Sequence, residues 1–214
     1  MQAGRERVRR LLLSTVAAVA VVAGLAGYAA ESLRGLELSS VDRRFAIRGD
    51  QQPQERLAIV AIDDKTFSDL KEPFPFKRSL HARVIDALKK DGARVIAYDV
   101  QFSELTDPDE DNALAESLRA AGNVVLATTE VDDEGRPNVL GGDPEALDLT
   151  RSVAGNANYV LQPGGTIRRM QYEIDGLKSF SIVTAEKAEG TRIARSELRV
   201  TQRNRATITA ARQL

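Results

Sequence analysis

The sequence predicts an α/β fold: an N-terminal transmembrane helix followed by a three-layer domain with a mainly parallel sheet and an additional β-hairpin. Three observations lead to this prediction. Residues 11–30 carry no charged side chain. Further along, apolar runs without alternation are each followed by a helical spacing of apolar residues. Late in the chain, Pro163 precedes two glycines, which is a sequence typical of a turn.

The uncharged segment, residues 11–30, is expected to cross a membrane, because an apolar helix of this length spans a hydrocarbon core of ~30 Å. Basic residues beside a spanning helix tend to stay in the cytoplasm, and four arginines precede this one. We therefore expect residues 1–10 to be cytoplasmic and residues 31–214 to form one extracytoplasmic domain. A cleaved signal peptide, with a cut near Gly27–Ala29, and a buried soluble helix are the alternatives.

Composition narrows the function classes. Residues 31–214 carry 26 Lys and Arg against 30 Asp and Glu, so their charge does not favour nucleic-acid binding. The chain contains no cysteine, which excludes disulfides and thiolate metal sites. No glycine-rich phosphate loop follows the first predicted strand, where Asp63, Asp64 and Lys65 stand, and no cofactor is expected.

The order of elements predicts parallel pairing of the strands. An amphipathic helix over 31–48 is expected to continue from the membrane, to end at Gly49 and to dock on the domain. Strands are then expected at 57–62, 94–100 and 124–128. A helix that Ser79 begins and Gly92 closes lies between the first two strands, and a helix with an acidic first turn, closed by Gly122, lies between the second and third. Such strand–helix alternation with short connections implies right-handed crossovers.

The rest of the chain is less regular. A short helical turn is expected near 144–149. Residues 157–162 and 166–173 flank the Pro163 turn and predict the β-hairpin. Residues 179–188 predict a helix ended by Gly190, and strand-like pieces follow at 198–201 and 206–209.

Strand ends supply the first candidate site. Asp63 and Asp64 follow the first predicted strand and Asp99 ends the second, and ligands of open α/β sheets bind at the carboxyl ends of strands. These carboxylates could hold Mg²⁺ or Ca²⁺, or a cationic ligand, and whether a metal binds is left open. The alternative is that they cap turns or pair with Lys65, Lys77 or Arg78.

A second candidate is the segment 73–79, where two prolines hold the backbone extended before a helix. Phe74, Phe76 and Arg78 are its candidate ligand contacts, as part of a lid over the acidic edge. The alternative is a stiff connector whose phenylalanines complete the core. Arg168 could pair with an acidic ligand or with the acidic edge, or lie in solvent.

His81 is the only histidine of the chain. At the second position of a predicted helix it is expected to be partly exposed, with proton sensing as the second interpretation.

Several of these residues together resemble the second type of CHASE domain, an extracytoplasmic sensor associated with cyclases and histidine kinases. The similarity is clearest over residues 38–130. The residues that carry it are Asp42, Phe45, Arg48-Gly49, Ile59–Asp64, Pro73–Arg78 with His81-Ala82, and Gly92–Ser103. Phe74 and Phe76 stand where tryptophan is often seen in relatives. The family's usual final strands and later membrane helices do not follow, which implies an incomplete domain and a fragment of a longer receptor.

The resemblance implies a function in signalling. It predicts a sensory input module of a bacterial transmembrane receptor that regulates a cytoplasmic adenylate or guanylate cyclase or a kinase, with no catalytic residue in this chain. The expected partners are the lipid bilayer, an unknown external stimulus or small ligand, and a second copy in a homodimer, but no nucleic acid. The alternatives are a membrane-anchored hydrolase that uses Asp63, Asp64 and Asp99 around a divalent metal, and a structural envelope protein.

Overall fold

The computed structural model describes residues 2–50, 56–143, 145–161, 164–168 and 170–195. In the amino-terminal helix it describes the side chains of residues 12–28 and 35–48. The chain divides into two compact units, Met1–Ala61 and Ile62–Leu214. The strand-like pieces expected at 198–201 and 206–209 lie outside the described residues.

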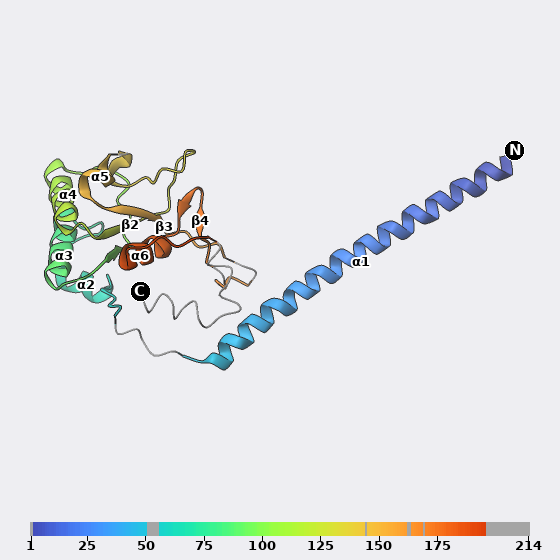
Figure 1. The fold of residues 1–214 in the computed structure, drawn as a ribbon, viewed down its shortest axis with the longest axis horizontal. Coiled ribbons are helices and arrows are strands. Elements are labelled where there is room, and N and C mark those ends of the chain that lie inside the picture. Colours follow the sequence, from blue (N-terminus) through green and yellow to red (C-terminus); the bar gives the residue numbers. More distant parts are fainter. Residues whose placement is uncertain (1, 51–55, 144, 162–163, 169, 196–214) are drawn as a thin grey trace. The chain divides into compact units, whose positions relative to one another are not determined.

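The first unit contains α1, a single α-helix from Gln2 to Arg48 that includes both segments for which helices were predicted (Figure 1). It ends as expected, because Gly49 adopts a φ of +64° and donates its N–H to the Phe45 carbonyl at 3.1 Å. Large apolar side chains of the helix are exposed, among them Leu12, Val16, Val19, Val22 and Leu25. Within the part of the chain whose side chains are described, no helix is both long enough and apolar enough to cross a membrane.

The strand expected over 57–62 does not form. These residues have no assigned secondary structure, and their side chains are exposed, with Ile59 83% accessible. A continuous apolar run favours extended backbone, but a strand also needs a hydrogen-bonded neighbour, and local propensity does not supply one. The prediction of a first strand at this position is therefore wrong.

The second unit is built on a parallel sheet of three strands: β1 (Ile96–Tyr98), β2 (Val124–Thr128) and β3 (Val153–Asn156), in that order. Ile96 is paired with Val124, and Leu126 with Ala154. All five residues of β2 are buried, as expected for the central strand of a parallel sheet. The parallel sheet predicted from the strand–helix alternation is thus confirmed for two of its predicted strands, and β3 takes the place of the missing one.

Helices cover both faces of this sheet. α3 (Arg78–Lys90) and α4 (Pro108–Ala121) run side by side (Figure 1) and bury Ile85, Leu114 and Leu118 against Val124 and Leu126. α6 (Phe180–Glu189) packs on the other face, where Gly155 approaches it. A Cβ at Gly155 would lie 2.5 Å from Phe180 Cα, so only glycine allows this close approach. The result is the predicted three-layer arrangement.

Local signals place most helix ends as expected. The exception is the start of α3, where Lys77 is the N-cap and no side chain caps the helix, so the prediction that Ser79 begins it is wrong: Ser79 already lies in the first turn. Asp107 caps α4 by accepting from the N–H groups of Asp109 and Glu110, and Pro108 occupies the first turn. Gly122 and Gly190 end α4 and α6 in left-handed conformations. Two short helices, α2 (Asp64–Leu70) and α5 (Ala146–Thr150), and a 3-10 turn at Leu140–Gly142 complete the helical part of the unit.

The antiparallel pair lies at a different place from the predicted hairpin. β4 (Glu173–Ile174) pairs with β5 (Leu177–Lys178) across Asp175 and Gly176, which both have positive φ. An Asp-Gly pair is well suited to such a two-residue turn. The described residues of 157–161 and 166–168 form no ladder with each other, and Pro163 lies outside the description. The turn chemistry around Pro163 predicted a strand at 157–162, but its described residues, 157–161, have no assigned strand.

Candidate functional site

The beginning of α3 is surrounded by aromatic side chains. Phe76 is buried, and its ring centre lies 5.2 Å from that of Phe67 and 5.8 Å from that of Phe74. Phe74 is 62% exposed and Phe67 is partly exposed. Buried Phe76 thus completes the core, as the connector interpretation required, whereas contact of exposed Phe74 with a ligand stays a prediction.

His81 lies deeper in the same cluster. It is 4% exposed, so the expectation of a partly exposed residue is wrong. Its Nδ1 lies 2.8 Å from the Tyr98 hydroxyl, and its ring packs edge-on against Tyr98 and Phe102 at centroid distances of 5.8 and 5.2 Å. Position within a helix does not determine which face meets the sheet, and here the buried face of α3 includes its fourth residue, His81.

Burial changes the titration of this pair. The apolar surroundings lower the pKa of His81, and the neighbouring Arg78 charge lowers it further. Burial raises the pKa of Tyr98 to about 12. Both side chains are therefore neutral at ordinary pH.

Arg78 is the charged member of the cluster, and it is buried. Its guanidinium pairs with Asp111 (Nη1–Oδ1 3.1 Å), donates to the Glu104 carbonyl, and lies 5.5 Å from the ring centre of Phe102. Asp111 also accepts from the backbone N–H and the hydroxyl of Thr106, at 2.8 and 2.7 Å. Arg78 thus ties the start of α3 to the loop after β1 and to the first turn of α4.

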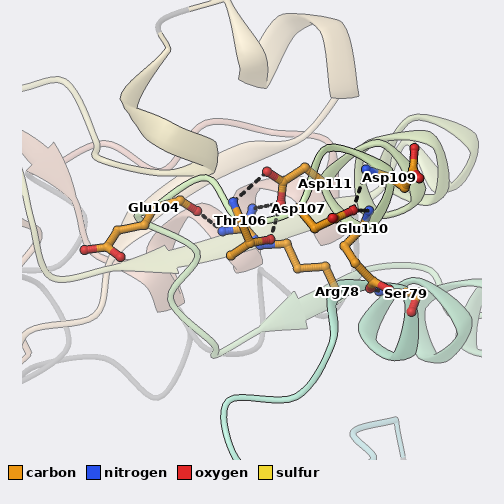
Figure 2. Close-up of polar contacts among 8 residues, drawn as sticks. All are labelled: Arg78, Ser79, Glu104, Thr106, Asp107, Asp109, Glu110 and Asp111. Carbon is orange, nitrogen blue, oxygen red and sulfur yellow. Dashed lines mark hydrogen bonds and ion pairs between the residues drawn. The ribbon is translucent and has the colours of Figure 1, made fainter.

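A second contact joins the same two helix ends. The Ser79 N–H donates to Glu110 Oε2 at 2.7 Å (Figure 2). This hydrogen bond is the main reason why the pKa of Glu110 is lowered, and Lys77 contributes a smaller electrostatic effect. The starts of α3 and α4 therefore behave as one polar clamp, which we define as Arg78, Ser79, Glu104, Thr106, Glu110 and Asp111.

The predicted acidic edge has a different structure. Asp63 caps α2, where it accepts from the N–H and hydroxyl of Thr66 at 3.0 Å each, and these bonds lower its pKa. Asp64 lies exposed in the first turn of α2, and Asp99 is exposed after β1. Among the described residues, no three His, Cys, Asp or Glu side chains gather closely enough to hold a metal ion.

Polar side chains nevertheless follow the strands at the carboxyl edge of the sheet. Thr129 after β2 donates its hydroxyl to Gln101 Oε1 after β1 at 2.8 Å, and Asn158 after β3 donates its side-chain amide to the Thr129 carbonyl at 3.0 Å. These neutral groups are joined to one another across the three strand ends. Arg168, the remaining predicted contact, is partly exposed between the Gly164-Gly165 turn and β4.

Sequence reasoning identified Phe74, Phe76 and Arg78 but not the partners that bury Phe76 and Arg78. The sequence places Tyr98 in the predicted strand 94–100 and Phe102 after it, without indicating that either contacts α3. One signal was available: Ile96 and Tyr98 alternate along β1, which places Tyr98 on the face that carries the core. The pairing of Arg78 with Asp111 had no local signal, because the two residues lie on different helices.

Comparison with known proteins gives one match. No curated protein and no solved structure matches the chain significantly. The CHASE2 domain family matches residues 16–213, which includes nearly the whole chain and every element described above apart from the first turns of α1. CHASE2 domains are extracellular sensory domains, and the three-layer unit with its buried cluster is the folded part over which the match extends. The chain therefore belongs to the CHASE2 domain family.

Proposed function

We propose that this chain is the extracytoplasmic input module of a bacterial transmembrane receptor, and that a stimulus outside the cell changes the activity of a cytoplasmic adenylate or guanylate cyclase or a kinase. The observation that carries the proposal is membership of a sensory family over residues 16–213. A usable signal requires the stimulus to favour one of two arrangements by ~1–3 kcal/mol.

Residues 11–30 are the proposed membrane anchor. They contain no charged side chain, and the side chains described at 12–28 are all exposed. An exposed apolar helix gains free energy when lipid surrounds it, because each buried CH₂ group contributes ~0.8 kcal/mol. The arginines before residue 11 favour a cytoplasmic amino end and an external domain. We also propose that the receptor acts as a homodimer.

The stimulus is proposed to act near the start of α3. Phe74 presents an exposed ring that rests on buried Phe76, and Arg78 links this segment to α4. A ligand that contacts Phe74 would therefore act on a segment attached to two helices. Asp63, Asp64, Asp99 and Arg168 remain further candidate contacts. The hydrolase alternative needs its aspartates around one metal, and no observation on the described residues favours it.

The absence of cysteine allows a direct test of the topology. We would place one cysteine at exposed Asp133 and, in a separate protein, one at Ala3, and treat intact cells with a membrane-impermeant maleimide. Asp133→Cys should be labelled in intact cells, and Ala3→Cys only after permeabilisation. Labelling of the two in the opposite order would contradict an external sensor.

The site is tested in the receptor that contains this chain. Phe74→Ala should shift the response of the cytoplasmic output to external medium components. Leu149→Ala is the matched control, because Leu149 is an equally exposed apolar residue on α5. Equal responses of both variants and the wild type would remove Phe74 from the site.

A further inference from the structure

The buried histidine, His81, is a titratable group to which the proposed stimulus site assigns no role. His81 is the only histidine in the chain, and its side chain is enclosed by Phe76, Tyr98 and Phe102. An unperturbed histidine changes charge near pH 6.5, within the range that external media reach. A charge change inside this cluster would occur where α3 meets β1 and the loop that follows it.

The hydrogen bond to Tyr98 suits the neutral ring. Because Tyr98 remains a phenol at ordinary pH, its O–H can donate to His81 Nδ1 when that nitrogen carries no proton. Protonation of Nδ1 reverses the bond, so that Nδ1–H becomes the donor and the phenol proton must find another acceptor. The charged ring would also be buried among three aromatic side chains without a carboxylate partner.

The charged groups around His81 would do little to stabilise a positive charge on its ring. On its own helix, Arg78 is a second cation one turn away. Tyr98 faces it from β1, and the loop after β1 contributes the uncharged ring of Phe102. Lys77 precedes α3. On α4, Asp111 is already paired with Arg78, and Glu110 accepts from Ser79. No described carboxylate lies within ion-pair distance of His81.

We propose that His81 is the proton-binding site of an acid-sensitive switch, in which its protonation loosens the first turns of α3 from Tyr98 and Phe102. The same step releases the polar clamp that holds the start of α4. The role of the switch in signalling rests on the proposed sensor function, and its ligand is then the proton.

The sign of the effect follows from linkage. The packed state holds the proton of His81 more weakly than an open state does, because burial and Arg78 lower the pKa from its ordinary value of 6.5. Above pH 6.5 the two states bind protons equally, and the packed state has its full stability. As the pH falls below 6.5 the open-to-packed ratio rises, by up to about tenfold per pH unit, until the lower folded-state pKa is reached.

A direct test uses the single histidine. The full chain, in lipid nanodiscs and ¹³C-labelled in the rings of histidine, tyrosine and phenylalanine, gives one histidine Cε1–H signal to follow by NMR between pH 8 and 4.5. We expect the signal of the packed state to titrate below 6.5, and the ring signals of Tyr98 and Phe102 to change with it. Titration at or above 6.5 with unchanged ring signals would overturn the proposal. No variant is needed for this measurement.

Opening itself is measured with two neighbouring cysteines. Ala82 is buried beside His81, and Arg83 is exposed on the same helix. The ratio of the thiol-labelling rate of Ala82→Cys to that of Arg83→Cys cancels the ordinary pH dependence of thiolate attack. This ratio should rise several-fold between pH 7.5 and 5.5 and stay constant when His81→Gln is added. The switch is refuted if the labelling ratio stays constant between pH 7.5 and 5.5 with His81 present. It is also refuted if the ratio rises equally in the His81→Gln variant.

The two proposals fail separately. A constant ratio together with external labelling of Asp133→Cys refutes the switch and leaves the external sensor. A pH-dependent ratio together with labelling of Asp133→Cys only after permeabilisation refutes the external sensor and leaves the proton-dependent opening of α3.

Discussion

At the scale of single residues, the buried charge of Arg78 is compensated by groups that come from two other segments. Asp111 and the Glu104 carbonyl both contact the guanidinium, and Thr106 donates its N–H to Oδ2 and its hydroxyl to Oδ1 of Asp111. A planar guanidinium carries several N–H donors in a fixed arrangement and can contact these partners at once, whereas an ammonium group lacks that arrangement. The sequence predicted Arg78 as a candidate contact, but local patterns cannot identify its partner Asp111, which lies on another helix.

Replacing Arg78 should therefore be costly. Arg78→Leu leaves a largely buried Asp111 carboxylate without its cation, and we expect a loss of about 3 kcal/mol in the free energy of unfolding, measured with urea. Arg78→Lys should lower the free energy of unfolding by less, because the positive charge remains. Arg136→Ala is the matched control, since this arginine also pairs with acids but in solvent, and its loss should be clearly smaller. Equal losses for Arg78→Leu and Arg136→Ala would contradict the clamp.

At the scale of elements, the contact between β3 and α6 depends on the absence of a side chain. Gly155→Ala would place a methyl group 2.5 Å from Phe180 Cα, and this backbone cannot move aside without lifting the helix. We expect a loss of about 1–3 kcal/mol in unfolding free energy and faster amide exchange in α6. Gly35→Ala, whose added methyl group meets open space, controls for the change of residue type. An unchanged exchange rate in α6 would show that the contact is looser than described.

The exposed apolar segment before α2, residues 57–62, gives a second test at this scale. Ile59 is highly exposed, so Ile59→Asn should change the unfolding free energy of the second unit by less than about 0.5 kcal/mol. Val125→Asn, in the buried central strand, should cost more than about 3 kcal/mol, because an amide would lie in the core without partners. A large loss for Ile59→Asn would mean that residues 57–62 pack as the strand that the sequence pattern favoured.

At the scale of the whole molecule, the division into two compact units predicts independent folding. A protein that begins at Arg56 retains the sheet, α2 to α6 and the polar clamp, and lacks only α1 and the residues that follow it. Its urea midpoint and the slope of its transition should equal those of the full chain in detergent, because the second unit is compact by itself and the slope scales with the surface that one folding unit exposes. A lower midpoint would show that α1 contributes to the stability of the sensor domain.

Predictions from sequence succeeded where the deciding interactions are local. The helices α3, α4 and α6 and the strands β1 and β2 were predicted because caps, glycine stops and apolar spacing act within about one turn of chain. Prediction was wrong for residues 57–62, for the hairpin and for the exposure of His81. In each case the outcome depends on a distant neighbour: a strand to pair with, a turn that aligns two strands, or a sheet face that covers a helix.

The sequence alone determined the uncharged stretch at residues 11–30, the positions at which most helices stop, the exclusion of thiol chemistry and the resemblance to a sensory family. These properties depend on composition and on contacts within a few residues. Only the tertiary structure decided which apolar runs became strands, that Arg78 meets Asp111, and that His81 lies buried beside Tyr98. The physical reason is that burial and ion pairing depend on which distant segments are brought together, and packing of the whole domain makes that selection.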